Sequence, residues 1–192
     1  MSVIAWDGAI IAADKMACCG DNAVTTKKLH MMVSGLIIGW TGDATIGVEL
    51  MSWYQHGANV EDWPKVQATD DWCRLIVWDP KHSRPLRFYE GRPFPFIVED
   101  RFAAWGSGRD YAIGAMAQGA NAIEAVRIAS QHCISCGMGI DHYPAPAETS
   151  AADEITGHQW TIGPNRYCEP FVVPRPPWCP PHDQLKKSME DR

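Results

Sequence analysis

The sequence predicts an α+β protein built from antiparallel sheets. Short apolar runs come in pairs separated by turn signals, and the first pair is divided by Asp7-Gly8, a dipeptide typical of tight hairpins. Helical spacing of apolar residues is confined to two blocks, one after Asp43 and one after Gly108. Because each helical block lies between groups of strands, the pattern favours α+β over an alternating parallel fold.

The first half of the chain predicts two hairpins and one helix. Strands are expected at 3–6 and 9–13, and again at 27–33 and 36–41, where Ser34-Gly35 makes the turn. Asp43 can cap the helix that follows, and Gly57 is a plausible end. The apolar residues of this helix recur at helical spacing: Ile46, Leu50, Trp53 and Tyr54.

The second half predicts more short strands and then two helices. Strands are expected at 73–78, 86–89 and 94–98, and the apolar run 102–105 leads into Gly106-Ser107-Gly108. Helices are expected over 109–118 and after Asn121. The composition changes after about residue 141, so the predicted core covers 2–142 and a proline-rich C-terminal extension covers 143–192. Within this extension, 157–162 is a strand candidate, and 174–181 is expected to be polyproline-like coil.

Composition excludes several classes of protein. The chain has 192 residues, of which 46% are hydrophobic and 21% charged, as in a globular protein. Its 17 basic against 23 acidic residues give a net charge of -6, which disfavours nucleic-acid binding. No apolar run approaches the length of a membrane helix, and the N-terminus lacks the features of a secretion signal. Seven cysteines, an odd number, are expected as free thiols in a reducing cytoplasm.

Ser2 is the first residue that suggests chemistry. Removal of the initiator methionine would make Ser2 the mature N-terminus, so that one residue carries both a hydroxyl nucleophile and an α-amine. The α-amine has an ordinary pKa near 8 and can accept a proton at working pH. A serine after Met1 is common, so position 2 gains weight only from the motifs that follow it.

An ordered set of motifs resembles the proteasome β-type peptidases, a threonine-protease family, and within it the HslV-like bacterial proteasome homologues. The resemblance covers residues 2 to about 140 and keeps its order throughout. Each motif alone is weak, whereas the ordered set is specific. The matching segments are Ser2-Val3-Ile4, Ala12-Ala13-Asp14, Thr26-Lys27-Lys28-Leu29, Gly39-Trp40-Thr41-Gly42-Asp43 and Trp105-Gly106-Ser107-Gly108-Arg109.

The resemblance implies an N-terminal nucleophile hydrolase fold, a four-layer α-β-β-α sandwich of two antiparallel sheets flanked by helices. It implies that Ser2 is the nucleophile and that the Lys28 ammonium favours its deprotonated form. Asp14 would orient Lys28. The amide N–H of Gly42 would face the developing oxyanion, and Ser107 would hydrogen-bond the terminal amine or a catalytic water.

Two departures from the family pattern qualify these roles. The usual nucleophile is threonine, whose methyl group restricts its rotamer, so a serine is expected to be less well oriented but still active. The segment 133–137 carries cysteine where proteasomes proper have an acidic residue. In the HslV-like branch, backbone carbonyls near this loop can hold a monovalent cation, which by position would be a structural Na⁺ on Ser130, Cys133 and Cys136. No other cofactor is expected.

The resemblance also implies partners. The family assembles into stacked homo-oligomeric rings, here of twelve or fourteen subunits, that cut peptides or unfolded proteins inside a chamber. An ATP-dependent unfoldase is a possible partner, because this chain has no phosphate-binding loop of its own. No nucleic-acid or membrane partner is expected.

Three alternatives remain open at this point. The first is a non-catalytic scaffold subunit of the same fold, although such subunits lack the nucleophile and the Asp/Lys pair. The second is an N-terminal nucleophile amidase that acts on small amides. A zinc site is the third reading, built from S and N ligands in two distant segments, and its residues are Cys133, Cys136, Cys168, Cys179 and His182.

Overall fold

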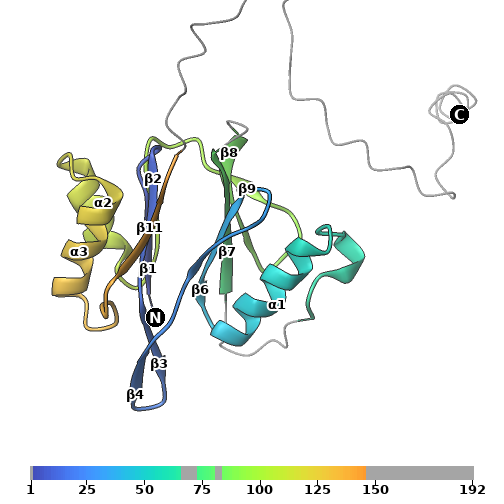
Figure 1. Cartoon of the computed structure of the whole chain (residues 1–192), viewed down its shortest axis with the longest axis horizontal. Helices are drawn as coiled ribbons and strands as arrows, with labels where there is room; N and C mark the ends of the chain where they lie inside the picture. Colours follow the sequence, from blue (N-terminus) through green and yellow to red (C-terminus); the bar gives the residue numbers. More distant parts are fainter. Residues whose placement is uncertain (1, 66–72, 81–83, 146–192) are drawn as a thin grey trace, which may run out of the picture. The chain divides into compact units, whose positions relative to one another are not determined.

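The computed structural model describes residues 2–65, 73–80 and 84–145. Within them, two antiparallel sheets pack face to face and helices cover both outer faces (Figure 1). The four-layer α-β-β-α sandwich expected from the family resemblance is therefore confirmed. The predicted strand at 157–162 and the coil at 174–181 lie outside the described residues, and the domain boundary at residue 142 stays a prediction.

The first sheet has the strand order β10-β1-β2-β11, and all its pairs are antiparallel. Its strands are β1 (Val3–Trp6), β2 (Ile10–Asp14), β10 (Ala103–Gly106) and β11 (Ile140–Pro144). The Asp7-Gly8 turn joins β1 to β2 as predicted. The Asp7 carboxylate accepts the backbone N–H groups of Ala9 and Ile10 at 2.9 and 2.7 Å, and Gly8 has a φ of 92°, which suits glycine.

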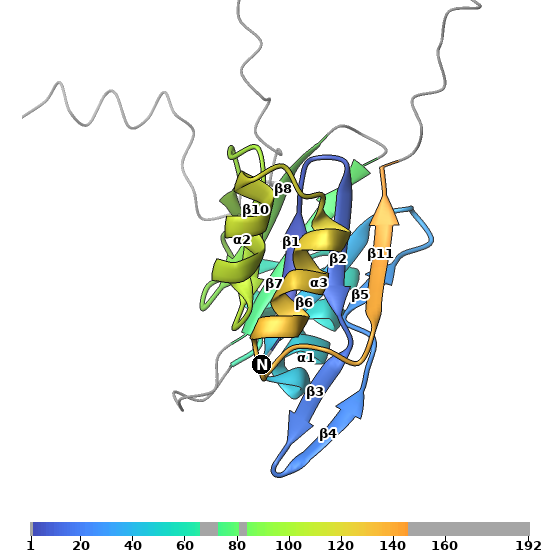
Figure 2. The ribbon, with the colours of Figure 1, turned by 90° about the vertical axis from the view of Figure 1, so that its left-hand side faces the viewer.

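The second sheet has the order β5-β6-β7-β8-β9. Its strands are β5 (Leu29–Met31), β6 (Ile37–Gly42), β7 (Cys73–Asp79), β8 (Arg84–Glu90) and β9 (Phe96–Ile97). Strand β9 is shorter than the predicted 94–98, because Pro95 lacks the N–H that a longer ladder would need. A small two-stranded sheet, β3 (Met16–Cys19) with β4 (Asn22–Thr25), extends beyond the first sheet (Figure 2).

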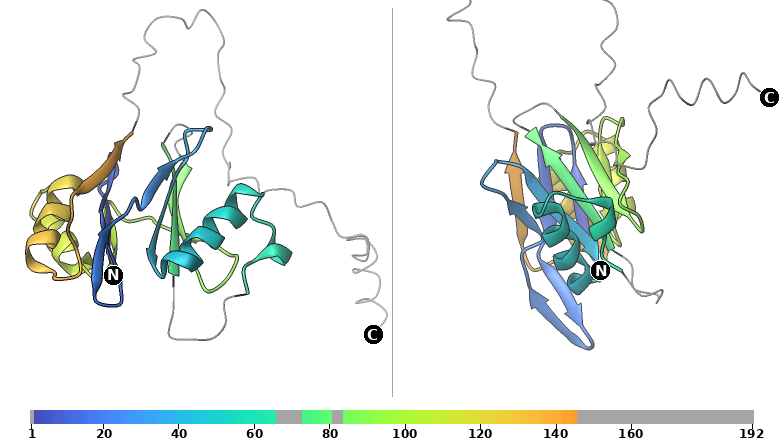
Figure 3. Two further views of the ribbon diagram at one scale, coloured as in Figure 1. Left: turned by 60° about the horizontal axis from the view of Figure 1, so that its bottom comes forward. Right: turned by 90° about the vertical axis from the view of Figure 1, so that its right-hand side faces the viewer.

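Three α-helices complete the sandwich. Helix α1 (Ala44–Gln55) covers the second sheet, while α2 (Arg109–Ala117) and α3 (Ala122–His132) cover the first (Figure 3). A 3₁₀ turn, η1 (Val60–Asp62), follows α1. Both predicted caps are present: Asp43 accepts the N–H groups of Thr45 and Ile46, and Asn121 accepts that of Glu124.

Alternation along the strands divides the buried residues among three interfaces. Val3, Ala5 and Ala12 face helices α2 and α3, whereas Ile4, Ile11 and Ala13 face the space between the sheets. In the second sheet, Trp40 and Leu75 pack under α1. The side chains that alternate with these along β6, β7 and β8 therefore face the first sheet.

Strands β3, β4 and β11 were not predicted. No element is predicted over 15–26, where β3 and β4 form a hairpin, and no strand is predicted over 140–144, where the composition changes. Strand β11 instead continues to Pro144 and pairs with β2, with Ile140 opposite Asp14. Pro144 is tolerated because it ends an edge strand of the described sheet, where its missing N–H costs little.

Candidate active site

Asp14 lies at the end of β2 and is completely buried. Its Oδ1 accepts hydrogen bonds from the Lys28 ammonium at 2.6 Å and from the Val3 N–H at 2.8 Å. Its Oδ2 accepts the N–H groups of Met16 and Gly137 at 3.1 and 3.0 Å. A carboxylate that accepts so many donors is satisfied in spite of its burial, and these hydrogen bonds hold the Asp14 side chain in one position.

Lys28 immediately precedes strand β5, reaches Asp14 from the second sheet and is only 4% exposed. Burial lowers its pKa from the ordinary 10.5, while the Asp14 carboxylate acts in the opposite direction and limits that decrease. Desolvation penalises the charged form of an amine, so Lys28 loses a proton more readily than a lysine on the surface. The structure therefore brings Lys28 and Asp14 together, and the catalytic roles that the family resemblance implies for them stay predictions.

Ser2 precedes β1 and is 3% exposed. Its neighbour Val3 donates to the same Asp14 oxygen that Lys28 contacts, which places the Ser2–Val3 peptide beside the ion pair. The Ser2 Oγ is buried without a hydrogen-bond partner in the described structure. A buried polar atom without a partner is costly and unusual, and this one belongs to the residue whose peptide lies beside a buried lysine–aspartate pair.

Two glycines hold the backbone of Ser2, and the sequence analysis did not assign them this role. Gly108 donates its N–H to the Ser2 carbonyl at 3.2 Å. Gly106 has a φ of 94°, and a Cβ there would lie 2.2 Å from the same carbonyl oxygen. Gly137 was also missed, as the residue whose N–H binds Asp14. The Gly106-Ser107-Gly108 sequence was the available signal for the first two residues.

Gly42 and Ser107 are placed near this end of the sandwich, but their predicted roles stay predictions. Gly42 ends β6 with a φ of 115°, immediately before the α1 cap. Ile4 packs against Gly39, so the end of β6 and the start of β1 lie at the same end of the sandwich (Figure 1). Ser107 is exposed, and its hydroxyl forms no hydrogen bond among the described residues.

A second buried hydroxyl, which has no hydrogen-bond partner within the described part of the chain, belongs to Thr41, which is 1% exposed. Thr41 is opposite Arg74 in the β6–β7 ladder, and Arg74 is opposite Glu90 in the β7–β8 ladder. Because Trp40 packs under α1, its neighbour Thr41 faces the space between the sheets. The row Thr41–Arg74–Glu90 therefore faces the first sheet at the end where Ser2 lies.

The loop after α3, which contains Cys133 and Cys136, packs against Gly108 next to the site. Cys136 is buried, and a Cβ on Gly108 would lie 2.8 Å from its Sγ. The Cys136 N–H binds the Cys133 carbonyl at 3.0 Å, and Ser130 Oγ binds the Val126 carbonyl within α3. No group of three His, Cys, Asp or Glu side chains that could hold a metal occurs among the described residues. Cys168, Cys179 and His182 of the zinc alternative lie outside them.

These contacts define what the site can do chemically. The Ser2–Val3 peptide lies beside a buried amine whose pKa is lowered and whose position is fixed by a carboxylate. A hydroxyl, an amine with a lowered pKa and a carboxylate that fixes the amine are the residue types from which a nucleophile, its base and an orienting group can be built.

No helix in the described part of the chain is long and apolar enough to cross a membrane.

Comparison with solved structures gives the fold family. The BPH protein of Thiobacillus denitrificans in complex with epoxomicin is 16% identical, with a TM-score of 0.55 over 76% of this chain and 98% of that one. The eukaryotic HslV of Trypanosoma brucei is 20% identical, with a TM-score of 0.55 over 74% and 97% of the two chains. The Anbu Gly-1 mutant from Hyphomicrobium sp. strain MC1 is 13% identical, with a TM-score of 0.54 over 75% and 82%.

No protein-family model and no curated protein sequence matches the chain. The evidence for kinship is therefore the three-dimensional arrangement, and at these identities it establishes the fold alone. That fold is the one the sequence motifs predicted.

Proposed function

We propose that this chain, which has the N-terminal nucleophile hydrolase fold of HslV and the proteasome β-type subunits, is a self-compartmentalising peptidase. Ser2, exposed as the N-terminal residue after removal of Met1, is its nucleophile. The observation that carries this proposal is the buried Ser2 hydroxyl, which has no hydrogen-bond partner among the described residues and belongs to the residue whose peptide lies beside the Lys28–Asp14 pair.

The proposed reaction is acyl transfer. The Ser2 Oγ gives its proton to the α-amine or to Lys28 and attacks the peptide carbonyl carbon. The oxyanion that forms is stabilised by the Gly42 N–H. The C–N bond then breaks, the amine fragment leaves with the proton, and an ester remains on Ser2. Water hydrolyses this ester, which releases the carboxylic acid and restores the hydroxyl.

Two features of the site support Lys28 in this role. A lysine with an ordinary pKa is fully protonated at neutral pH, whereas burial lowers the pKa of Lys28. Asp14 fixes its ammonium at 2.6 Å and is itself fixed by three backbone N–H groups. In this proposal, removal of Met1 exposes the α-amine of Ser2, and Ser107 binds this amine.

The assembly follows from the same fold. We propose stacked homo-oligomeric rings of twelve or fourteen subunits in the cytoplasm that degrade peptides or unfolded proteins, with an ATP-dependent unfoldase as a possible partner. The neighbours named HslV and BPH support a ring-forming subunit. A structural Na⁺ would lie at the carbonyls of Ser130, Cys133 and Cys136, at the end of α3. Electron-microscopy class averages of the full chain test the ring and its symmetry.

The catalytic proposal is tested by comparing wild-type protein with Ser2→Ala on fluorogenic peptides and on unfolded casein. Loss of hydrolysis in Ser2→Ala, with unchanged unfolding, supports the proposal, and an unchanged rate contradicts it. Epoxomicin, the compound bound in the T. denitrificans structure, supplies a second reading, because a covalent adduct would map to the N-terminal peptide.

The same assays separate the alternatives. A wild-type protein that assembles into rings but hydrolyses nothing is a scaffold subunit. A protein that hydrolyses small amides but neither peptides nor casein is an amidase. The Lys28–Asp14 pair favours a catalytic subunit, since a buried ion pair is costly to build and is not needed for packing alone.

A further inference from the structure

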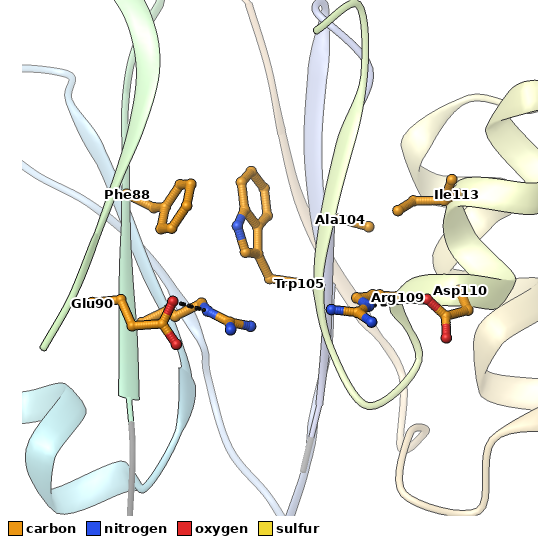
Figure 4. Close-up of a pocket in the computed structure, with 8 residues that line it drawn as sticks. Phe88, Glu90, Ala104, Trp105, Arg109, Asp110 and Ile113 are labelled. Carbon is orange, nitrogen blue, oxygen red and sulfur yellow. Dashed lines mark hydrogen bonds and ion pairs between the residues drawn. The ribbon is translucent and has the colours of Figure 1, made fainter. Parts of the chain in front are cut away.

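A cavity of about 460 Å³ opens at the edge of the sandwich next to the candidate active site. This volume is within the usual range for ligand pockets. The cavity is lined by residues of both sheets and of α2: Arg74, Phe88, Glu90, Ala104, Trp105, Arg109, Asp110 and Ile113 (Figure 4). None of these residues has a role in the proposed acyl transfer.

Its position follows from the strand register. Trp105 immediately precedes Gly106, whose backbone lies against the Ser2 carbonyl, and Arg109 immediately follows Gly108, which donates to that carbonyl. On the opposite sheet, Arg74 is paired with Thr41, the neighbour of Gly42. Because strand residues are about 3.3 Å apart, the cavity begins within one or two residues of the proposed nucleophile.

The floor of the cavity is aromatic and aliphatic. Phe88 and Trp105 approach each other from the two sheets, with ring centroids 5.9 Å apart and planes tilted by 59° (Figure 4). Ala104 and Ile113 form the part of the wall between β10 and α2. A wall of this composition binds an apolar ligand group most favourably, and an aromatic ring in the ligand adds binding energy through tilted packing.

The charges at the rim balance. Arg74 is paired with Glu90 at 2.7 Å, and Arg109 with Asp110 at 2.9 Å. The first pair is half-buried and the second is exposed, so charge lies toward the solvent while the floor is apolar. Two positive and two negative groups leave no net charge, so the cavity does not select an acidic or a basic side chain.

The cavity also follows a free strand edge. Strand β10 is at the edge of its sheet and, among the described strands, pairs only with β1. An edge strand presents unpaired backbone groups that can bind an extended peptide, while alternate side chains of that peptide enter pockets on the two faces. Here Trp105 lines one face of the edge and Ala104 the other.

We propose that this cavity is a substrate subsite, which takes an aromatic or large aliphatic side chain of an extended peptide lying along the edge of β10. The inference rests on the proposed peptidase function and adds a substrate preference to it.

Cleavage of a peptide library tests the preference. In the full-length wild-type protein, cleavage within two residues of Phe, Tyr or Leu is expected about tenfold more often than beside Ala, Asp or Lys, as hydrophobic pockets usually discriminate. Ile113→Trp, which enlarges a side chain of the cavity wall, should abolish this enrichment. Ala117→Trp, an exposed change on the same helix outside the cavity wall, should keep it. Peptide cleavage without enrichment, or enrichment that survives in Ile113→Trp, would overturn the inference.

A binding measurement separates this inference from the proposed function. N-acetylphenylalaninamide is titrated into the Ser2→Ala protein by NMR, with N-acetylalaninamide as the comparison. We expect the aromatic probe to bind about tenfold more tightly, and Ile113→Trp or Ile113→Ala to remove most of this difference. Equal binding of the two probes refutes the subsite even if peptides are cleaved. Selective binding that is lost in the Ile113 variants supports it even if they are not.

Discussion

Replacing Asp14 with asparagine tests how much of this fold depends on the buried ion pair. The carboxylate accepts four donors, and Oδ2 alone accepts the N–H groups of Met16 and Gly137. An asparagine keeps one acceptor oxygen and turns an NH₂ group toward two of these donors, and it leaves the Lys28 ammonium without its counter-charge. Removing one partner of a buried ion pair costs about 3–5 kcal/mol, a large share of the roughly 5–15 kcal/mol that stabilises a domain.

The assay is urea unfolding followed by tryptophan fluorescence at one protein concentration. We expect the free energy of unfolding of Asp14→Asn to fall by about 3–5 kcal/mol. Asp21→Asn makes the same chemical change in the exposed β3–β4 turn and should stay within about 0.5 kcal/mol of wild type. A decrease below about 1 kcal/mol for Asp14→Asn would refute the reasoning, because the contacts at Asp14 would then be of little energetic value.

Three further predictions concern the residues around Asp14. Burial lowers the folded-state pKa of Lys28 below 10.5, so the unfolded chain keeps this proton to higher pH. The stability of wild type relative to Lys28→Met should therefore rise with pH until 10.5; urea midpoints whose difference stays constant from pH 8 to 10.5 would contradict this. Ser2→Thr keeps the hydroxyl and adds a methyl group that restricts its rotamer, so peptide hydrolysis should stay within about tenfold of wild type or increase, and an inactive, folded Ser2→Thr would argue against Ser2 as the nucleophile. In Gly106→Ala the new Cβ would displace the Ser2 carbonyl, and we expect kcat/KM to fall at least about 100-fold; Gly114→Ala, where nothing lies within 4 Å of the new Cβ, is the matched control and should keep full activity.

The sequence predicted the Ser2, Asp14 and Lys28 constellation because its motifs are short and keep a fixed order along the chain. It did not identify Gly137 as a partner of Asp14, since the two residues are 123 positions apart. No local pattern encodes a hydrogen bond between a distant loop N–H and a carboxylate. The turn at Asp7-Gly8 and the caps at Asp43 and Asn121 were predictable because their physical cause is local.

The cavity illustrates a different limit of sequence patterns. Leu75 and Ile76 are both completely buried although they point to opposite faces of β7. A strand covered by a helix on one face and a sheet on the other shows no polar–apolar alternation that would identify the inner face. The neighbours of Arg74 were therefore not predictable until the packing of the two sheets was known.

The mass and the activity of one protein preparation test the central claim most directly. We predict that the protein that cleaves peptides has lost Met1. We also predict that epoxomicin modifies this protein on Ser2, which mass spectrometry of the N-terminal peptide would show. A preparation that retains Met1 on every chain and still cleaves peptides at an undiminished rate would contradict the assignment of Ser2 as an N-terminal nucleophile.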